Sequence, residues 1–320
     1  MGVSFLTPIA ALFALLALVP LAIFAGRRRR AERVRSALRL EPSTGRTWVA
    51  LAVSLAAVPV LVGVAAAQPV ITSARTIPQR SDAEVFVVMD TSRSMLASAA
   101  SGEETRFEHA RAEALTLQEE LPGVPVGIAS FTDRVLPHLF PTVDQRVFRE
   151  TMDESVGIER PPPSTSFGTN VTTLDALGVV PTLNFFTPKV KKRALVVFTD
   201  GDSQPVSSVL SSDFAHKPQV HVTFVHMGNV SDRIYASGIA EAGYRQDPTS
   251  GATLTAAAHA TRGQVVEEGE ISTVAADIRE ELGEGPTVDR RIEGSRRALM
   301  PFVALLAVIP LGFVLLRRNL

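Results

Sequence analysis

Residues 84–95 of the 320-residue chain read EVFVVMDTSRSM, and they identify the central region as an α/β domain. The first six residues are nearly all apolar. A strand of this composition has both faces covered, as in a parallel sheet between two layers of helices. The polar residues that follow, 90–94, therefore lie at the carboxyl end of a buried strand, where such sheets bind their ligands.

Short apolar segments alternate with amphipathic ones after this stretch, as strands and helices do around a parallel sheet. Besides 84–89, strands are expected at residues 124–131, 135–140, 193–198, 219–226 and 264–267. Helices are expected at residues 106–121, 144–154, 169–183, 254–261 and 271–282. The strands before and after residues 132–134 predict a hairpin at one edge of the sheet. The pattern predicts a doubly wound, mostly parallel sheet with one antiparallel edge strand over residues 82–284.

Three uncharged runs lie outside this domain, and each is long enough to cross a membrane. They cover residues 1–26, 47–74 and 298–316. The prolines inside these runs are tolerated in lipid-embedded helices but are unusual in soluble ones. The sequence therefore predicts three transmembrane helices, with a polar juxtamembrane stalk at 285–297. Three buried core helices are the less favoured alternative.

The loop predicted at residues 27–46 sets the orientation. It holds eight arginines and two glutamates, a net charge of +6, and short arginine-rich loops stay in the cytoplasm. Subtracting this +6 and the +2 of Arg317 and Arg318 from the total of −1 leaves −9 for residues 75–297. We therefore expect a multi-pass cell-membrane protein with an extracytoplasmic domain. Four arginines between 290 and 297 oppose this bias, but large domains translocate largely regardless of their charge.

Several classes of function are excluded by composition. The chain has no cysteine, so it has no disulfide, thiolate metal site or thiol nucleophile. Its aromatic content is 6% and its net charge is −1, which argues against nucleic-acid binding. The sequence contains no HExxH, no phosphate-binding GxxxxGK[ST] loop and no GxSxG elbow. We expect no enzyme, although a Mg²⁺-dependent phosphatase with Asp90 as nucleophile stays open.

Candidate metal ligands occur in three separate loops. Asp90, Ser92 and Ser94 present one carboxylate and two hydroxyls at alternate positions after the first buried strand. Asp200 follows the strand at 193–198, and Thr169 opens a predicted helix after a proline-rich loop. Mg²⁺ prefers oxygen ligands and retains some of its water, which suits a set of few charges and several hydroxyls. Taken alone, Asp and Ser at such spacing are also common helix caps and turn residues.

These residues resemble the metal-ion-dependent adhesion site of the von Willebrand factor A (VWA) domain, which combines a DxSxS loop, a threonine and an aspartate. The resemblance implies that Asp90, Ser92, Ser94, Thr169 and Asp200 hold Mg²⁺, with Mn²⁺ or Ca²⁺ as alternatives. It also implies that a glutamate or aspartate of a partner protein completes the coordination. We expect Asp133 and Asp202 to be solvated loop acids, and Arg93 to be either a partner contact or an ordinary surface residue.

The order of two spans, an arginine-rich loop, an A domain and a third span resembles the BatA/BatB-type membrane proteins of bacterial aerotolerance operons. This resemblance implies a protein-interaction role in envelope complex assembly or stress tolerance. It also implies a MoxR-type AAA+ ATPase and other VWA proteins as partners. Two alternatives stay open. One is a structural membrane protein whose A domain binds no metal. The other is a subunit of a metal-chelatase-like machine, which the three spans disfavour.

Overall fold

The apolar stretch after residue 83 forms strand β3 (Ala83–Asp90), which is buried along its whole length. It lies inside a six-stranded sheet of order β10-β7-β6-β3-β4-β5. The other five strands are β4 (Val126–Phe131), β5 (Val135–Thr142), β6 (Lys192–Thr199), β7 (Val220–His226) and β10 (Gln264–Glu267). All pairs in this sheet are parallel except β4 with β5, which is antiparallel and places β5 at the edge. The predicted fold class is confirmed.

This computed structural model describes residues 2–38, 45–160 and 172–318. It divides the chain into two compact units. One comprises Met1–Thr76 with Arg291–Leu320, and the other comprises Ile77–Arg290. The second unit contains the six-stranded sheet and both of the hydrophobic clusters that surround it.

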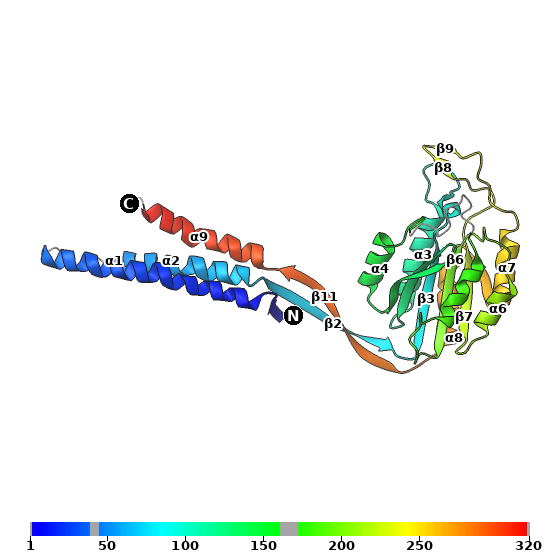
Figure 1. Cartoon of the computed structure of the whole chain (residues 1–320), viewed down its shortest axis with the longest axis horizontal. Helices are drawn as coiled ribbons and strands as arrows, with labels where there is room; N and C mark the ends of the chain where they lie inside the picture. Colours follow the sequence, from blue (N-terminus) through cyan, green and yellow to red (C-terminus); the bar gives the residue numbers. More distant parts are fainter. Residues whose placement is uncertain (1, 39–44, 161–171, 319–320) are drawn as a thin grey trace. The chain divides into compact units, whose positions relative to one another are not determined.

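Helices cover both faces of the sheet (Figure 1). Alternate side chains of β3 enter different clusters, Val87 on one face and Phe86 on the other. One cluster is formed with α3 (Arg106–Glu120), α4 (Gln145–Glu154) and α8 (Ile271–Leu282). The other is formed with η3 (Leu174–Gly178), α5 (Val179–Thr182), α6 (Ser208–Phe214) and α7 (Ser250–Thr261). The sheet is therefore sandwiched, which explains why its central strands are uniformly apolar.

Local signals set the ends of several helices. Thr105 and Glu108 form a capping box at the start of α3, and the side chain of Asp144 accepts hydrogen bonds from the backbone at the start of α4. The helix expected at 169–183 is shorter than predicted, because η3 starts only at Leu174. Its first residues, 169–171, lie outside the described residues. Thr172 and Thr173 are not helical, as expected for β-branched residues that favour extended backbone.

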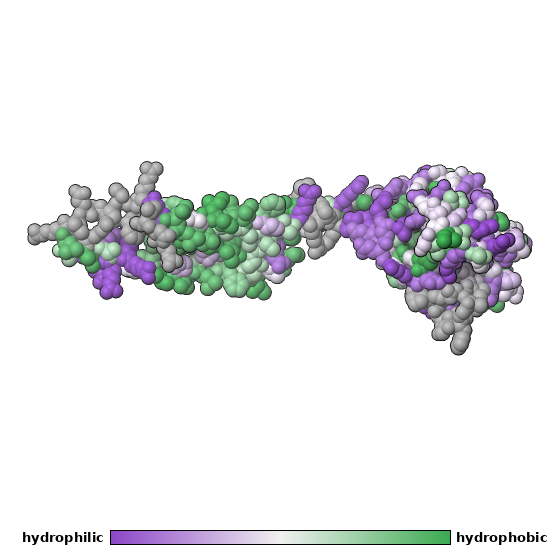
Figure 2. Space-filling view, turned by 90° about the horizontal axis from the view of Figure 1, so that it is seen from above, coloured by the Kyte–Doolittle hydropathy of each residue, from purple (hydrophilic) through white to green (hydrophobic). Residues whose placement is uncertain are grey.

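The first unit contains the apolar helices. The first is η1 (Pro8–Ala17), which continues directly into α1 (Leu18–Ala37). The other two are α2 (Gly45–Ala66) and α9 (Met300–Arg318). Among the described residues, three helical segments are long and apolar enough to cross a membrane, and these are Pro8–Val34, Val49–Ala66 and Met300–Arg317. Figure 2 shows apolar side chains over this helical part of the chain. At Gly63 of α2 a Cβ atom would lie 2.6 Å from the backbone nitrogen of Ala14, so glycine is needed for this close approach of η1 and α2.

The boundaries of the apolar segments differ from those predicted. Residues 2–5 form strand β1 (Gly2–Phe5) rather than the start of the helix expected at 1–26. Helix α2 ends at Ala66 and strand β2 (Pro69–Arg80) follows, so the helix expected at 47–74 stops early. Pro69 and the β-branched residues after it favour extended backbone. The stalk expected at 285–297 lies almost wholly in strand β11 (Thr287–Ala298), which pairs with β2, and α9 begins at Met300 instead of residue 298.

The segment 27–46 is not simply a loop. Helix α1 continues through its first half to Ala37, and the side chain of Arg28 forms an ion pair with Glu32 one turn later. Arginine has a high helix propensity, and an (i, i+4) pair adds to it. Residues 39–44 lie outside the described part of the chain, and α2 begins at Gly45.

Candidate functional site

The turn after β3 brings three of the predicted residues together. The backbone N–H of Ser92 donates to Oδ1 of Asp90 at 2.9 Å, and the hydroxyl oxygens of Ser92 and Ser94 lie 2.9 Å apart. All three residues are buried, and Asp90 is 0% exposed. The alternate spacing turns one carboxylate and two hydroxyls toward each other at the carboxyl end of the strand, as the sequence predicted.

Asp200 reaches the same edge because β6 is the parallel neighbour of β3. The register pairs Met89 with Phe198, so Asp90 lies opposite Thr199, next to Asp200. The Thr199 hydroxyl donates to Oδ2 of Asp90 at 2.6 Å, and the backbone N–H of Asp202 donates to Oδ1 of Asp200 at 3.0 Å. Burial, together with the negative charge of Asp200, raises the pKa of Asp90 to about 7. The two carboxylates thus share one buried environment.

Thr169 lies outside the described residues. The chain three residues later is attached to the Asp200 loop: the carbonyl of Thr172 accepts hydrogen bonds from the Ser203 hydroxyl at 3.1 Å and from the backbone N–H of Gln204 at 3.0 Å. The Leu174 N–H donates to the Ser203 hydroxyl at 3.1 Å. The structure therefore joins the segment after Thr169 to the loop that carries Asp200.

A buried arginine at this site was not predicted. Arg106, the first residue of α3, is 2% exposed. Its guanidinium donates to Oδ2 of Asp200 at 2.9 Å and to Oδ2 of Asp232 at 3.0 Å. It also donates to the carbonyl of Asn229 at 2.7 Å, to the side-chain oxygen of Gln246 at 2.8 Å and to the Tyr244 hydroxyl at 3.1 Å.

The Arg106 contacts connect the Asp200 loop with the segment 229–246, which holds the small hairpin of β8 (Tyr235–Ala236) and β9 (Ile239–Ala240). The sequence contains one weak signal for this role of Arg106. A positive charge in the first turn of a helix opposes the helix dipole, so it needs compensation by nearby carboxylates. Nothing in the spacing indicated which carboxylates those would be.

The charges at the site do not cancel. Asp90, Asp200 and Asp232 are all buried, and Arg106 is the cation among them. With Asp90 ionised, the cluster carries a net charge of about −2, which is costly in a buried environment. Two carboxylates and two hydroxyls are the oxygen donors that a hard divalent cation takes. The residues present therefore fit a Mg²⁺-type ion, although in the described part of the chain no group of three or more His, Asp or Glu side chains has metal-binding geometry.

Two other predicted residues have partners of their own. Asp202 is half-buried instead of fully solvated, and burial together with the charges of Asp200 and Asp247 raises its pKa. Arg93 is 56% exposed and forms an ion pair with Glu241 at 2.5 Å. Backbone hydrogen bonds between Ser98 and Arg233, 3.0 Å in both directions, form a further link between the DxSxS turn and the segment 229–246. This segment thus forms part of the surroundings of the site.

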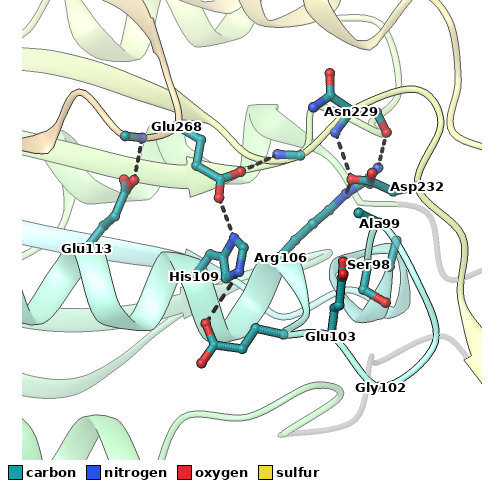
Figure 3. Close-up of a pocket in the computed structure, with 14 residues that line it drawn as sticks. Ser98, Ala99, Gly102, Glu103, Arg106, His109, Glu113, Asn229, Asp232 and Glu268 are labelled. Atoms are coloured by element: carbon teal, nitrogen blue, oxygen red, sulfur yellow. Dashed lines mark hydrogen bonds and ion pairs between the residues drawn. The ribbon is translucent and has the colours of Figure 1, made fainter.

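A cavity of about 730 Å³ lies beside the site (Figure 3). Arg106 and Asp232 line it on one side. On another side the His109 ring of α3 contacts Glu268 and lies 3.4 Å from Glu104. The Glu268 side chain also accepts a hydrogen bond from the Gly228 N–H at 2.9 Å. These contacts attach α3 to the loops that follow β7 and β10.

Comparison with known proteins agrees with this architecture. Residues 85–203 match the family model of the von Willebrand factor type A domain. The structure of BatB from Bacteroides thetaiotaomicron is similar, with a TM-score of 0.51 and 19% identity over 62% of this chain and 98% of that chain. An aerotolerance-related membrane protein from Bacteroides fragilis gives a TM-score of 0.49 and 21% identity, over 62% of this chain and 98% of that one. No curated protein sequence matches the chain significantly. On the sequence match of residues 85–203 and on the sheet topology, the central part of the chain is a von Willebrand factor type A domain, and it is similar in fold to BatB.

Proposed function

We propose that this chain is a membrane-anchored interaction protein whose A domain binds a carboxylate of a partner protein through a divalent cation. The residues that would hold the ion are Asp90, Ser92, Ser94, Asp200 and, outside the described residues, Thr169. Mg²⁺ is the first candidate, and Mn²⁺ and Ca²⁺ are the alternatives. When bound, the ion supplies a positive centre that neutralises the site and attracts an acidic side chain. The observation that carries this proposal is the buried carboxylate pair of Asp90 and Asp200, with its uncompensated charge.

Binding is favoured over catalysis by the groups around Asp90. It accepts hydrogen bonds from the N–H and the side chain of Ser92 and from the Thr199 hydroxyl. None of these groups takes up a proton at neutral pH, whereas metal-assisted hydrolysis requires a general base or a second metal ion. We therefore propose that the chain is not an enzyme.

We further propose that the three apolar helices cross the membrane and that the A domain lies outside the cytoplasm. The arginines of segment 27–46 support this orientation. The resemblance of the order of spans and A domain to the BatA/BatB-type proteins extends the proposal to a role in envelope assembly or stress tolerance. Other VWA proteins and a MoxR-type ATPase are the candidate partners.

One observation favours a second candidate, a structural membrane protein whose A domain binds no metal. The Arg106 guanidinium already contacts Asp200 at 2.9 Å and neutralises part of its charge. In that case the buried polar cluster serves only to hold the segment 229–246 in place. Titration of the protein with Mg²⁺, using Ser92→Ala as the comparison, separates the two candidates.

The main test is pull-down from crosslinked membranes with wild type, Asp90→Ala and the control Asp153→Ala. Asp153 is a carboxylate on the outer side of α4 that is 49% exposed, so the control removes an acid without touching the site. We expect capture of the partner with wild type and Asp153→Ala, and its loss in chelator and with Asp90→Ala. Capture that is unchanged in chelator would contradict the proposal.

Orientation can be tested cleanly because the chain has no cysteine. A single Ser231→Cys substitution in the A domain introduces one exposed thiol, and Ser36→Cys introduces one at the end of α1. In intact cells a membrane-impermeant maleimide is expected to label the first thiol and not the second. The reverse pattern would show that the A domain is cytoplasmic.

A further inference from the structure

The helical unit has a strongly basic end, which we call the arginine end. It comprises Arg27 to Arg30 and Arg33 on α1, together with Arg317 near the end of α9. Helix α9 starts beside the end of α2, where the Leu299 N–H donates to the Pro69 carbonyl at 2.8 Å. It packs along α2 and ends toward the arginine-bearing side of the unit (Figure 1). The arginines of two chain segments far apart in sequence therefore gather at one end.

The position of the first arginines matches the edge of a hydrocarbon layer. The ten residues of η1 and the nine from Leu18 to Gly26 carry no charge. At 2.0 Å per residue for 3₁₀-helix and 1.5 Å for α-helix they span about 33 Å, against a hydrocarbon core of about 30 Å. Arg27 to Arg30 follow directly, so in a membrane they lie at the depth of the lipid headgroups.

The arrangement around the helix axis points to lipids rather than to a protein. Successive residues of an α-helix are about 100° apart, so the four arginines 27–30 project in all directions around α1. A protein partner contacts one face of a helix, whereas a headgroup layer surrounds it. All four side chains are exposed, and Arg28 has the carboxylate of Glu32 as its partner. In the described part of the chain, no ion pair is formed by Arg27, Arg29 or Arg30.

The chemistry of the arginine side chain indicates which class of ligand this end binds. Segment 27–46 contains eight arginines and no lysine. A guanidinium presents paired N–H donors that match two oxygens of a phosphate, which the ammonium of lysine cannot do. We propose that the arginine end binds the headgroups of anionic phospholipids. This inference rests on the insertion of α1 in the membrane, which is part of the proposed function, but not on the metal site.

The test is native mass spectrometry of the full chain in detergent with dioleoyl phosphatidylglycerol or phosphatidylcholine, lipids with the same acyl chains. The variant is Arg27→Gln/Arg29→Gln/Arg30→Gln. Its control, Arg146→Gln/Arg149→Gln/Arg245→Gln, removes three exposed arginines from the A domain. A third variant, Arg27→Lys/Arg29→Lys/Arg30→Lys, keeps the charge and shows whether loss of binding comes from misfolding.

We expect wild type and the control to retain phosphatidylglycerol in preference to phosphatidylcholine. The glutamine variant is expected to lose this preference by about 5-fold per arginine at low salt, and the lysine variant to retain an intermediate part of it. Equal retention of both lipids by wild type, or an unchanged preference in the glutamine variant, would overturn the proposal. So would complete displacement of the lipid by inorganic phosphate or by a polyglutamate peptide, which would indicate a free-anion site or an acidic protein partner.

Two measurements distinguish a failure of the lipid proposal from a failure of the proposed function. Mg²⁺ titration of the glutamine variant reports on the A domain alone and is expected to match wild type. Labelling of Ser36→Cys reports on membrane orientation without reference to lipid type. A chain with intact metal binding and the expected labelling, but no lipid preference, refutes only the lipid proposal.

Discussion

Replacing Asp90 by Asn is expected to stabilise the metal-free A domain at pH 8. The carboxyl of Asp90 is 0% exposed and has no cationic partner among the described residues, while Asp200 adds a second negative charge nearby. Its pKa of about 7, against 3.8 for a free aspartate, corresponds to a cost of about 4 kcal/mol for holding the charge in the folded state. Asn has nearly the same shape but no charge, so this cost disappears.

The substitution also has a smaller opposing effect. An Asn oxygen can still accept the hydrogen bond from the Ser92 N–H, but the Thr199 hydroxyl loses its carboxylate acceptor. Loss of one such hydrogen bond costs about 1 kcal/mol. The net gain is therefore about 3 kcal/mol, which corresponds to a rise in Tm of about 6–12 °C for a domain of this size.

The pH dependence has a definite sign. Because the pKa of Asp90 is raised in the folded state, the folded domain keeps this proton up to about pH 7, whereas the unfolded chain releases it near pH 4. The stability contributed by the proton is complete below about pH 4 and is lost as the pH rises from 4 to 7. The difference between Asp90→Asn and wild type should therefore be small at pH 4 and reach its full size by pH 8.

The assay is thermal unfolding of residues 77–290 in chelator, followed by circular dichroism between pH 4 and pH 8. This segment contains both hydrophobic clusters of the A domain. Comparing the two proteins at each pH cancels the titration of all other groups, such as His138, whose pKa is lowered by burial. An Asp90→Asn domain no more stable than wild type at pH 8 would refute the reasoning. It would mean that Asp90 is effectively solvated or paired.

Three further outcomes are expected. Mg²⁺ at about 100 times its Kd should stabilise wild type by about 3 kcal/mol in the same unfolding assay. The Ser92→Ala variant should gain less stability from Mg²⁺. An equal gain in both proteins would exclude Ser92 as a ligand. Arg106→Met leaves two buried carboxylates without a cation and should destabilise the domain by about 3–5 kcal/mol, measured by denaturant unfolding in chelator. A loss of stability below about 1 kcal/mol would show that the ion pairs of Arg106 contribute little. Gly63→Leu should separate η1 from α2 and lower the thermal stability of the full chain in detergent, whereas Gly312→Leu, with no atom within 4 Å of the added Cβ, should not.

The sheet of the A domain could be predicted because its strands are buried on both faces. The composition of runs such as 84–89 and 193–198 alone predicts buried strands, and an aspartate follows each run within two residues. Two of the site carboxylates could therefore be found, because the carboxyl ends of adjacent parallel strands meet at one edge. The adjacency itself, β3 beside β6, is a tertiary feature that the strand segments do not encode locally.

The parts that could not be predicted depend on contacts between distant segments. Arg106 meets its partners 94 to 140 positions later in the chain, and no local pattern marks such a pairing. Strands β2 and β11 pair across more than two hundred residues and are polar, so neither shows the apolar signal of a strand. The charge of the segment after residue 26 predicts a loop, although helix propensity and the pair of Arg28 with Glu32 favour the helix found.

Arg106 sets the net charge of the site, and this net charge bears on which cation the proposed metal site would bind. Without Arg106, the buried carboxylates of Asp90, Asp200 and Asp232 would repel one another with a net charge of about −3, which would destabilise the metal-free domain. With a second arginine, the net charge would be about −1, and a divalent ion would leave an excess of positive charge. The arrangement found, with one guanidinium held by Asp200 and Asp232, leaves about −2 when Asp90 is ionised. In the proposed metal site a monovalent ion would leave half of that charge unneutralised, so this charge balance favours a divalent ion. Because an ion that binds only the folded state stabilises it, we expect the proposed ion to offset the free energy lost by burying Asp90.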